Sequence, residues 1–206
     1  MNVKEALTKL REGKERKFDQ TVELIINLRA IDVKRDQVNT VISLPHRIKD
    51  KKVCGFLTEK SKIVDSITEG QFAKYSEKDA LKKLVKDYDY FISVAKLMPK
   101  VATHFGKVLG PVGKMPSPQL GILPQENEQA IKAVLEKINS SLKIRLKEAS
   151  FKVVVGKQSM DDEKIAENIK VVYHALENAL PKKKENVKNV MLKLTMTKPI
   201  RVEVEQ

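Results

Sequence analysis

The 206-residue chain contains no tryptophan, a single cysteine and three histidines. The one cysteine, Cys54, cannot form an internal disulfide and is typical of a protein in a reducing compartment. The three histidines are scattered, with no cysteine or carboxylate at ligand spacing, so we expect no metal and no cofactor. No apolar run approaches the ~20 residues that cross a bilayer, and no apolar stretch near Met1 marks the chain for export. These shortages predict a cytoplasmic protein with no membrane partner.

Positive charge is what the chain has in excess. It has 40 lysines and arginines against 27 acidic residues, a formal net charge of +13. An excess of this size is typical of proteins that bind nucleic acid, and less often of proteins that bind an anionic membrane surface. The membrane interpretation requires a basic amphipathic helix or a long apolar span, and the mean hydropathy of -0.36 gives it no support. Composition therefore favours a nucleic-acid partner.

Glycine, proline and lysine concentrate in residues 97–118. Glycine permits unusual backbone, proline stiffens it and lysine adds charge, so we expect a recognition loop here. The loop is not the phosphate-binding loop of a nucleotidase, because Met115 follows Lys114 where that motif requires serine or threonine. It is not a dinucleotide fingerprint either, since the third glycine is missing at the required offset.

Apolar periodicity predicts two kinds of architecture along the chain. The expected helices are 3–16, 76–85, 126–140 and 159–176, and the expected strands are 18–30, 39–44, 53–57, 90–95, 143–146, 151–155, 187–194 and 200–204. Ser76 and Ser159 are each expected to open a helix with a capping box. Strands alternate with helices in the middle of the chain, which indicates parallel pairing there.

We therefore expect a mixed fold of α+β and α/β parts. Residues 1–46 and 154–206 are expected to form one discontinuous α+β domain of split βαβ-like type. Residues 47–153 are expected to form an inserted, Rossmann-like, three-layer α/β domain. Two chain crossings between the domains would act as a hinge.

Three ordered motifs resemble those of a known family. Residues 17–24, Lys-Phe-Asp-Gln-Thr-Val-Glu-Leu, resemble its Lys-Phe-Asp-Glu-Thr-Val-Glu opening. Residues 106–118 resemble its Gly-x-x-Leu-Gly-Pro-x-Gly-x-Met-Pro-x-Pro signature, and residues 194–197 resemble its Thr-Met-Gly-Pro terminus. The family is the universal stalk protein of the large ribosomal subunit, ribosomal protein L-one. The resemblance covers essentially the whole chain and is to the archaeal branch.

The resemblance implies a protein that is not an enzyme and that is a monomer when free of RNA. It implies that the discontinuous domain binds the ribosomal RNA stalk, that the protein assists release of deacylated tRNA from the exit site, and that it represses its own mRNA. Carried over by position, the RNA-binding residues are Lys17, Phe18, Thr21, Glu23, Gly156, Lys157, Asn189, Thr195, Met196 and Thr197. A second RNA-facing loop would present Lys107, Gly110, Gly113, Lys114 and Met115. The chain departs from the family at Thr197, where glycine is usual, and at Val112, which is often arginine.

Two other function classes stay open at this point. A phosphate- or nucleotide-handling enzyme would turn over nucleotide, and a protein–protein adaptor would bind its partner regardless of salt. Within the RNA-binding interpretation, Phe18 has the alternative of a core residue that anchors its strand. The hydroxyls of Thr21 and Thr195 suit RNA, because a hydroxyl can donate to phosphate and accept from a 2′-OH.

Overall fold

The structure is a computed structural model that describes residues 1–13, 16–32, 35–36, 38–75, 77–146 and 148–204. The chain divides into two compact units. Unit 1 consists of Met1–Ile48 and Ser140–Gln206, and unit 2 consists of Lys49–Asn139. The observed mixture of sheets and helices agrees with an α+β fold.

Within its described residues, unit 1 contains two helices, a 3-10 turn and six strands: α1 (Val3–Arg11), β1 (Thr21–Leu28), β2 (Asn39–Ser43), β7 (Ser141–Arg145), β8 (Ser150–Lys157), α5 (Asp162–Ala179), η3 (Lys183–Asn186), β9 (Val187–Leu194) and β10 (Ile200–Val202). Four strands form an antiparallel sheet in the order β10-β9-β1-β8, and β2 pairs with β7 in a separate ribbon. The chain re-enters unit 1 before residue 154, because Ser43 pairs with Ser141 and the Leu44 N–H donates to the Ser140 carbonyl at 2.7 Å.

The two faces of the four-stranded sheet differ in character. Alternate residues of β1, from Val22 to Leu28, are buried in one core with the apolar residues of α1 and α5. Successive side chains of a strand point to opposite faces, so the residues between them point away from this core. Of the β1 residues that point this way, Ile25 is buried, whereas Thr21, Glu23 and Asn27 are only partly buried. We call this side of the sheet the open face.

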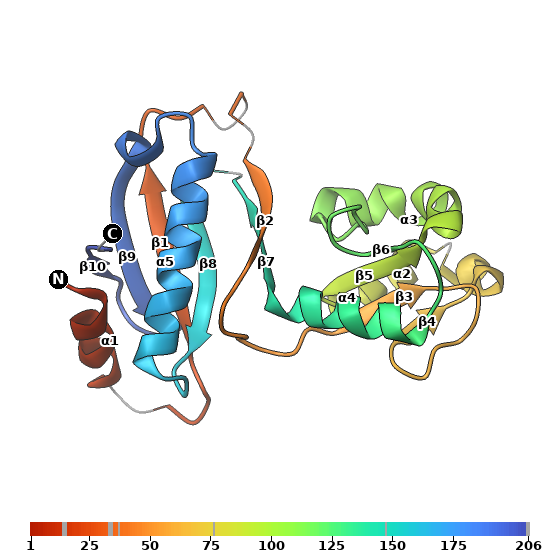
Figure 1. Cartoon of the computed structure of the whole chain (residues 1–206), viewed down its shortest axis with the longest axis horizontal. Helices are drawn as coiled ribbons and strands as arrows, with labels where there is room; N and C mark the ends of the chain where they lie inside the picture. The colour runs from red at the N-terminus through yellow and green to blue at the C-terminus, as the bar shows by residue number, and fades with distance from the viewer. Residues whose placement is uncertain (14–15, 33–34, 37, 76, 147, 205–206) are drawn as a thin grey trace. The chain divides into compact units, whose positions relative to one another are not determined.

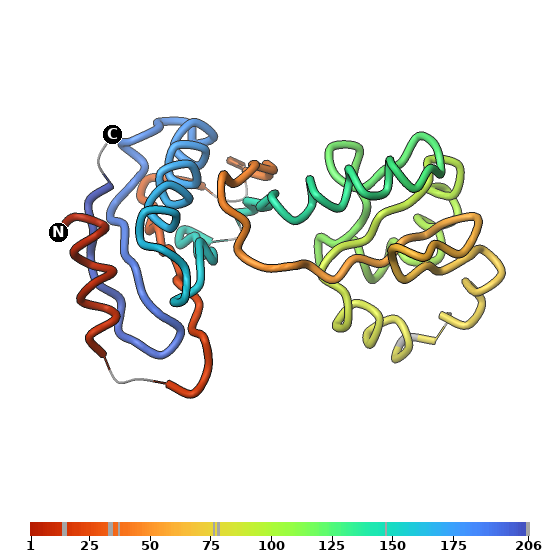
Figure 2. The backbone as a smooth tube through the Cα atoms, turned by 60° about the horizontal axis from the view of Figure 1, so that its bottom comes forward, coloured from red at the N-terminus to blue at the C-terminus, as the bar shows by residue number. Residues whose placement is uncertain are grey.

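Unit 2 contains a four-stranded sheet, in which all neighbouring strands are parallel, with helices and 3-10 turns: β3 (Val53–Phe56), β4 (Asp65–Ile67), η1 (Glu69–Tyr75), α2 (Lys78–Asp87), β5 (Tyr90–Val94), η2 (Ala95–Leu97), α3 (Met98–Val112), β6 (Ile122–Leu123) and α4 (Glu128–Ser140). Cys54, Phe56 and Phe91 pack against η1, α2 and α3. Lys51 and Tyr90 lie at the opposite face beside the end of α4, where the Lys51 ammonium donates to the Ile138 carbonyl at 2.7 Å. Figure 2 shows α2 and α4 on opposite sides of these strands.

The glycine–proline segment is mostly helix, and its expected loop is wrong for residues 98–112. Pro99 stands in the first turn, where no helical N–H is needed, and Pro111, which has no N–H to donate back into the helix, stands in the last turn. Gly113 ends α3 with a left-handed φ of 77°, and its N–H and that of the next residue bond back to the helix. Only the residues after α3 form the loop.

Smaller differences have equally local causes. α5 begins at Asp162 with Asp161 as its N-cap, so the cap expected at Ser159 is wrong: Ser159 bonds Asp19 instead. The three-residue strand β4 was not expected, because so short a run carries little periodicity. α1 ends at Arg11 instead of residue 16. The capping serine expected at Ser76 lies outside the described residues.

Cys54 is 1% exposed, and burial raises the pKa of its thiol to about 12. The thiol is therefore a small packed side chain and not a nucleophile. Within the described residues, none of the helices has the length and apolar character to cross a membrane.

Candidate nucleic-acid interface

Three segments that are far apart in the sequence meet at one edge of the unit 1 sheet. Figure 1 shows that β1 begins where β8 and β9 end, as their antiparallel pairing requires. Thr21 pairs with Lys157 of β8, and Val22 pairs with Leu194 of β9. The opening of β1, the turn after β8 and the turn after β9 therefore form one continuous edge.

Thr21 and Thr195 form the centre of this edge. Their hydroxyl oxygens lie 2.9 Å apart, and the Thr21 N–H donates to the Thr195 hydroxyl at 3.1 Å. The Thr195 N–H also donates to the Thr21 carbonyl at 3.1 Å. The Thr195 hydroxyl also lies 3.5 Å from the Thr21 carbonyl, to which it can donate, so the lone pairs left on the two hydroxyl oxygens are what this pair offers a ligand. Both threonines are partly buried, and the Thr195 hydroxyl is held in place by the backbone of Thr21.

Two large apolar side chains flank the threonines. Phe18 is 52% exposed and Met196 is 58% exposed, which makes them two of the four exposed large hydrophobic residues that the structure shows. Exposure of this size excludes the alternative in which Phe18 anchors the core. An exposed aromatic ring on the segment that leads into β1 suits the face of a base or a sugar.

Charged side chains surround the same edge. Lys17 is exposed, and the Lys157 ammonium lies 3.7 Å from the Asp19 carboxylate. Asp19 also accepts from the N–H and the hydroxyl of Ser159, at 3.0 and 2.8 Å. It thereby holds the turn after β8 beside the opening of β1. We call the following set the threonine surface: Lys17, Phe18, Thr21, Glu23, Lys157, Thr195 and Met196.

Lys193 belongs to this neighbourhood, although the sequence analysis did not single it out. Its ammonium lies 3.7 Å from the Glu23 carboxylate, and both side chains are partly buried. Glu23 is two residues from Thr21 and Lys193 is two residues from Thr195, so all four share the open face. The period of two was the signal that could have identified Lys193.

Asn189 lies elsewhere on the open face. It pairs with Asn27, six residues along β1 from Thr21, which corresponds to roughly 20 Å of strand. Asn27 donates to the Asn189 side-chain oxygen at 2.7 Å, and the Ser150 hydroxyl donates to the Asn27 side-chain oxygen at 2.8 Å. Asn27 and Ser150, which the sequence analysis missed, thus fix the orientation of Asn189 without bringing it to the threonine surface.

Two of the expected RNA-binding residues have internal roles. A Cβ on Gly156 would lie 2.9 Å from the Ile165 side chain, so this glycine allows β8 to pack closely on α5. The Thr197 hydroxyl accepts from the Leu194 N–H at 2.9 Å, and the Thr197 N–H donates to the Leu194 carbonyl at 3.0 Å. Thr197 therefore closes the turn after β9, at the position where glycine is usual in the resembling family.

Of the residues expected to form a second RNA-facing loop in unit 2, some are exposed and others are partly buried. Lys107 and Gly110 are exposed on α3, and a Cβ on Gly110 would meet nothing within 4 Å. Gly113 and Met115 are partly buried beyond the helix end. Lys114 instead donates to the carbonyls of Val85 and Tyr88, both at 2.7 Å, and so caps the C-terminus of α2.

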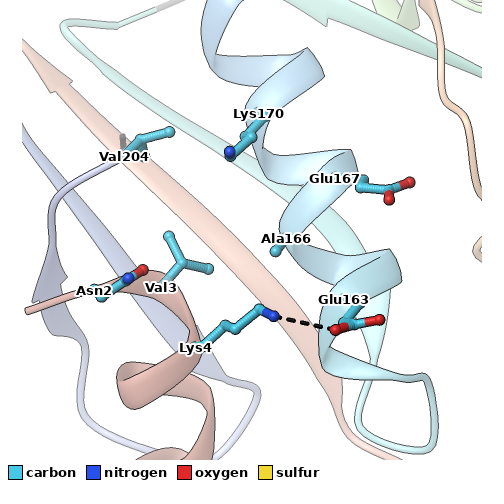
Figure 3. A pocket seen from close by; sticks show the side chains of 8 residues that line it. All are labelled: Asn2, Val3, Lys4, Glu163, Ala166, Glu167, Lys170 and Val204. Atoms are coloured by element: carbon cyan, nitrogen blue, oxygen red, sulfur yellow. Dashed lines mark hydrogen bonds and ion pairs between the residues drawn. The ribbon is translucent and has the colours of Figure 1, made fainter. Parts of the chain in front are cut away.

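A hollow of about 370 Å³ lies on the other side of unit 1, between α1 and α5. Figure 3 shows its lining, with Val3, Ala166 and Val204 as the apolar part and Lys4 reaching Glu163 across it at 3.1 Å. The hollow holds no histidine, serine or cysteine that could act as a nucleophile or base. Nowhere in the described residues do three or more histidine, cysteine or acidic side chains gather in a way that could hold a metal ion.

Lys51 is a further group whose surroundings change its chemistry. Burial lowers the pKa of its ammonium to about 8, against the attraction of Asp89. A lysine with a lowered pKa can act as a nucleophile. This ammonium, however, donates to the Ile138 carbonyl and lies 4.8 Å from the centre of the Tyr90 ring, so its surroundings give it a structural role at the end of α4.

Comparison with known proteins finds one family, which both the family match and the individual relatives share. Residues 10–198 match the ribosomal protein L1p/L10e family. The large ribosomal subunit protein uL1 of Nanoarchaeum equitans is 37% identical over 204 residues, which cover 94% of this chain and 96% of the relative. The uL1 proteins of Pyrobaculum islandicum and Archaeoglobus fulgidus are 36% and 35% identical, with 96% and 94% of this chain and 90% and 93% of the relatives covered.

Proposed function

Since the chain belongs to the ribosomal protein L1p/L10e family, we propose that it binds the ribosomal RNA stalk of the large subunit through the threonine surface. Family membership makes it a large-subunit protein of the cytoplasmic ribosome that associates with ribosomal RNA. It also argues against an enzyme, because the relatives are ribosomal proteins.

The arrangement at Thr21 and Thr195 is the observation that carries this proposal. Two hydroxyls 2.9 Å apart share a hydrogen bond; Thr21 follows the exposed Phe18 by three residues, and Thr195 directly precedes the exposed Met196. The lone pairs of the two hydroxyl oxygens can accept from a 2′-OH, the group that separates RNA from DNA, and a hydroxyl that turns from its internal bond can donate to phosphate. The apolar side chains can cover a sugar or base while the hydroxyls bond the backbone.

Charge supports the same assignment. Lys17 and Lys157 lie at the rim of the threonine surface, where ammonium groups can replace counterions on phosphate. Glu23 offers a carboxylate, which accepts from a base amine or a 2′-OH and contributes selectivity instead of general attraction. The surface therefore combines groups that bind any RNA with groups that distinguish one RNA from another.

The proposal also assigns different partners to the two units. Units 1 and 2 would be separate domains, with stalk recognition in unit 1, and the protein would be monomeric when free of RNA. In unit 2, the exposed Lys107 and Gly110 of α3 would face the deacylated tRNA that leaves the exit site. Its own mRNA would bind the threonine surface when it presents the shape of the ribosomal site, and translation would then be repressed.

A filter-binding titration tests the proposal. The full chain is titrated against a stalk fragment of large-subunit ribosomal RNA and against a scrambled RNA of the same length. We expect the stalk fragment to bind at least about a hundredfold more tightly, with Phe18→Ala reducing that ratio by about tenfold through lost stacking. Equal affinity of the wild-type protein for the two RNAs would contradict stalk recognition.

A further inference from the structure

Gln20 lies directly before Thr21 and is only 2% exposed. A primary amide so deeply buried is costly unless its donors and acceptor are bonded. Its neighbours Asp19 and Thr21 belong to the site by their contacts, whereas Gln20 cannot touch a ligand from inside the protein. The buried amide of Gln20 must therefore find its hydrogen-bond partners within the protein.

The bonds of Gln20 reach both other segments of the site. Its side-chain oxygen accepts from the Met196 N–H at 3.1 Å. Its side-chain nitrogen donates to the Gln158 side-chain oxygen at 3.2 Å, and its carbonyl accepts from the Gln158 N–H at 2.7 Å. One residue thus joins the opening of β1 to the turn after β8 and to the turn after β9, across sequence separations of 138 and 176 residues.

From these contacts we propose that Gln20 is a positioning residue for RNA recognition, which rests on the proposed function. It holds Met196 and the turn that follows Lys157 in register with Thr21 before RNA arrives. A surface that is already ordered loses less conformational freedom on binding than a surface that RNA must order. Without the amide, the turn after β9 keeps its internal Thr197 bonds but loses its tie to β1 at Met196.

Three variants distinguish positioning of the RNA-binding surface from a general effect on the stability of the fold. Gln20→Met keeps the length and volume of the side chain and removes both side-chain bonds. Gln20→Glu keeps the acceptor for the Met196 N–H, so it is the conservative replacement. Gln71→Met is the matched control, because the Gln71 side-chain oxygen likewise accepts from a backbone N–H, that of Thr68, at 3.2 Å, but in unit 2.

Two measurements are made on the full chain: affinity for the stalk fragment and for the scrambled RNA, and hydrogen exchange of the Met196 amide in the free protein. We expect Gln20→Met to lose roughly fivefold in affinity for the stalk fragment, with scrambled RNA unaffected and Met196 exchange accelerated. Gln20→Glu should restore most of the affinity and the protection. Gln71→Met should behave as wild type in both measurements.

The outcomes distinguish this inference from the proposed function. A folded Gln20→Met variant with wild-type affinity and wild-type Met196 protection would overturn the inference alone. Equal losses for both RNAs would also overturn it, because they would indicate a general structural role. Wild-type protein that fails to prefer the stalk fragment would overturn the proposed function and this inference with it. Should Gln20→Met not fold, Gln158→Ala removes one of the two side-chain bonds, and the same selective loss is required of it.

Discussion

The threonine surface of unit 1 and the α3 region of unit 2 use their polar side chains in different ways. At the threonine surface, bonds join residues about 140 to 176 positions apart, as between Asp19 and Ser159 or Thr21 and Thr195. At α3 the bonds are more local: Thr103 bonds Pro99 four residues away, and Lys114 caps a helix that ends 27 residues earlier. The first region assembles a surface, while the second region completes helices.

This difference shows that the glycines, prolines and lysines of such a motif can serve helix ends as well as a loop. The prolines of α3 fit its first and last turns, and Gly113 provides the left-handed residue that ends it. The threonine motifs look ordinary in sequence, yet they produce an edge with exposed apolar residues and a shared hydroxyl pair. If this comparison holds, variants at the threonine surface should weaken binding of stalk RNA, and variants at Lys114 should lower the stability of unit 2.

The largest effect on recognition is expected from the threonine hydroxyls. Thr21→Val removes a hydroxyl while nearly keeping its shape, and it should weaken stalk RNA binding about tenfold because an RNA group loses its partner. Thr195→Val should lose as much affinity and also about 1 kcal/mol of stability, since the Thr21 N–H then lacks its acceptor. Filter binding and thermal unfolding measure the two effects.

The controls for this prediction come from the same residue type. Thr195→Ser keeps the hydroxyl and should bind close to wild type. Thr103→Val removes an exposed hydroxyl of α3 that bonds the Pro99 carbonyl, and it should leave RNA binding unchanged. If Thr21→Val and Thr195→Val, both folded by circular dichroism, bind like wild type, the paired-threonine site is wrong.

A stability effect without a binding effect is expected at Lys114. Lys114→Met removes two charge-assisted bonds to the C-terminal carbonyls of α2 and should destabilise unit 2 by about 1–2 kcal/mol. Stalk RNA binding should stay unchanged. Lys107→Met, on an exposed lysine of α3, should leave stability unchanged in the same denaturant titration. Reduced RNA affinity of folded Lys114→Met would instead return this lysine to the RNA-facing set.

The smallest change is expected in the salt dependence of binding. Lys17→Ala should lower the slope of log affinity against log salt by about 0.7–0.9 if it removes one phosphate contact. Lys157→Ala should lower it less, because Asp19 already lies 3.7 Å from that ammonium. Lys83→Ala, an exposed lysine of α2, is the control with no change. Identical slopes for Lys17→Ala and Lys83→Ala would place Lys17 off the interface.

Sequence patterns predicted part of this picture for clear physical reasons. The apolar alternation of β1 and the helical spacing of α5 follow from periods of two and 3.6, so these elements were expected, with shifted ends. Val101, Phe105 and Leu109 have the same helical spacing within α3, but the glycines and prolines of this segment are typical of a loop. Turn-like composition was therefore misleading where the prolines stand at the helix ends.

Other features depend on contacts that no local pattern encodes. Gln20 becomes a bridge only because β8 and β9 flank β1, and its partners stand more than 130 residues away. Lys114 becomes a cap only when α2 packs beside the end of α3. The family resemblance indicated Phe18, Thr21 and Thr195, whereas the side chains that hold them in place required the fold.

The most direct test of the central claim separates the two units. Ile48 is joined to Ser140 through a short glycine linker, which the adjacent Leu44 and Ser140 backbones permit, and Lys49–Asn139 is expressed alone. The joined chain should bind the stalk fragment within about threefold of the full chain, while the middle piece should show no preference for it. A folded joined chain that fails to bind, or a middle piece that binds selectively, would contradict recognition through the threonine surface.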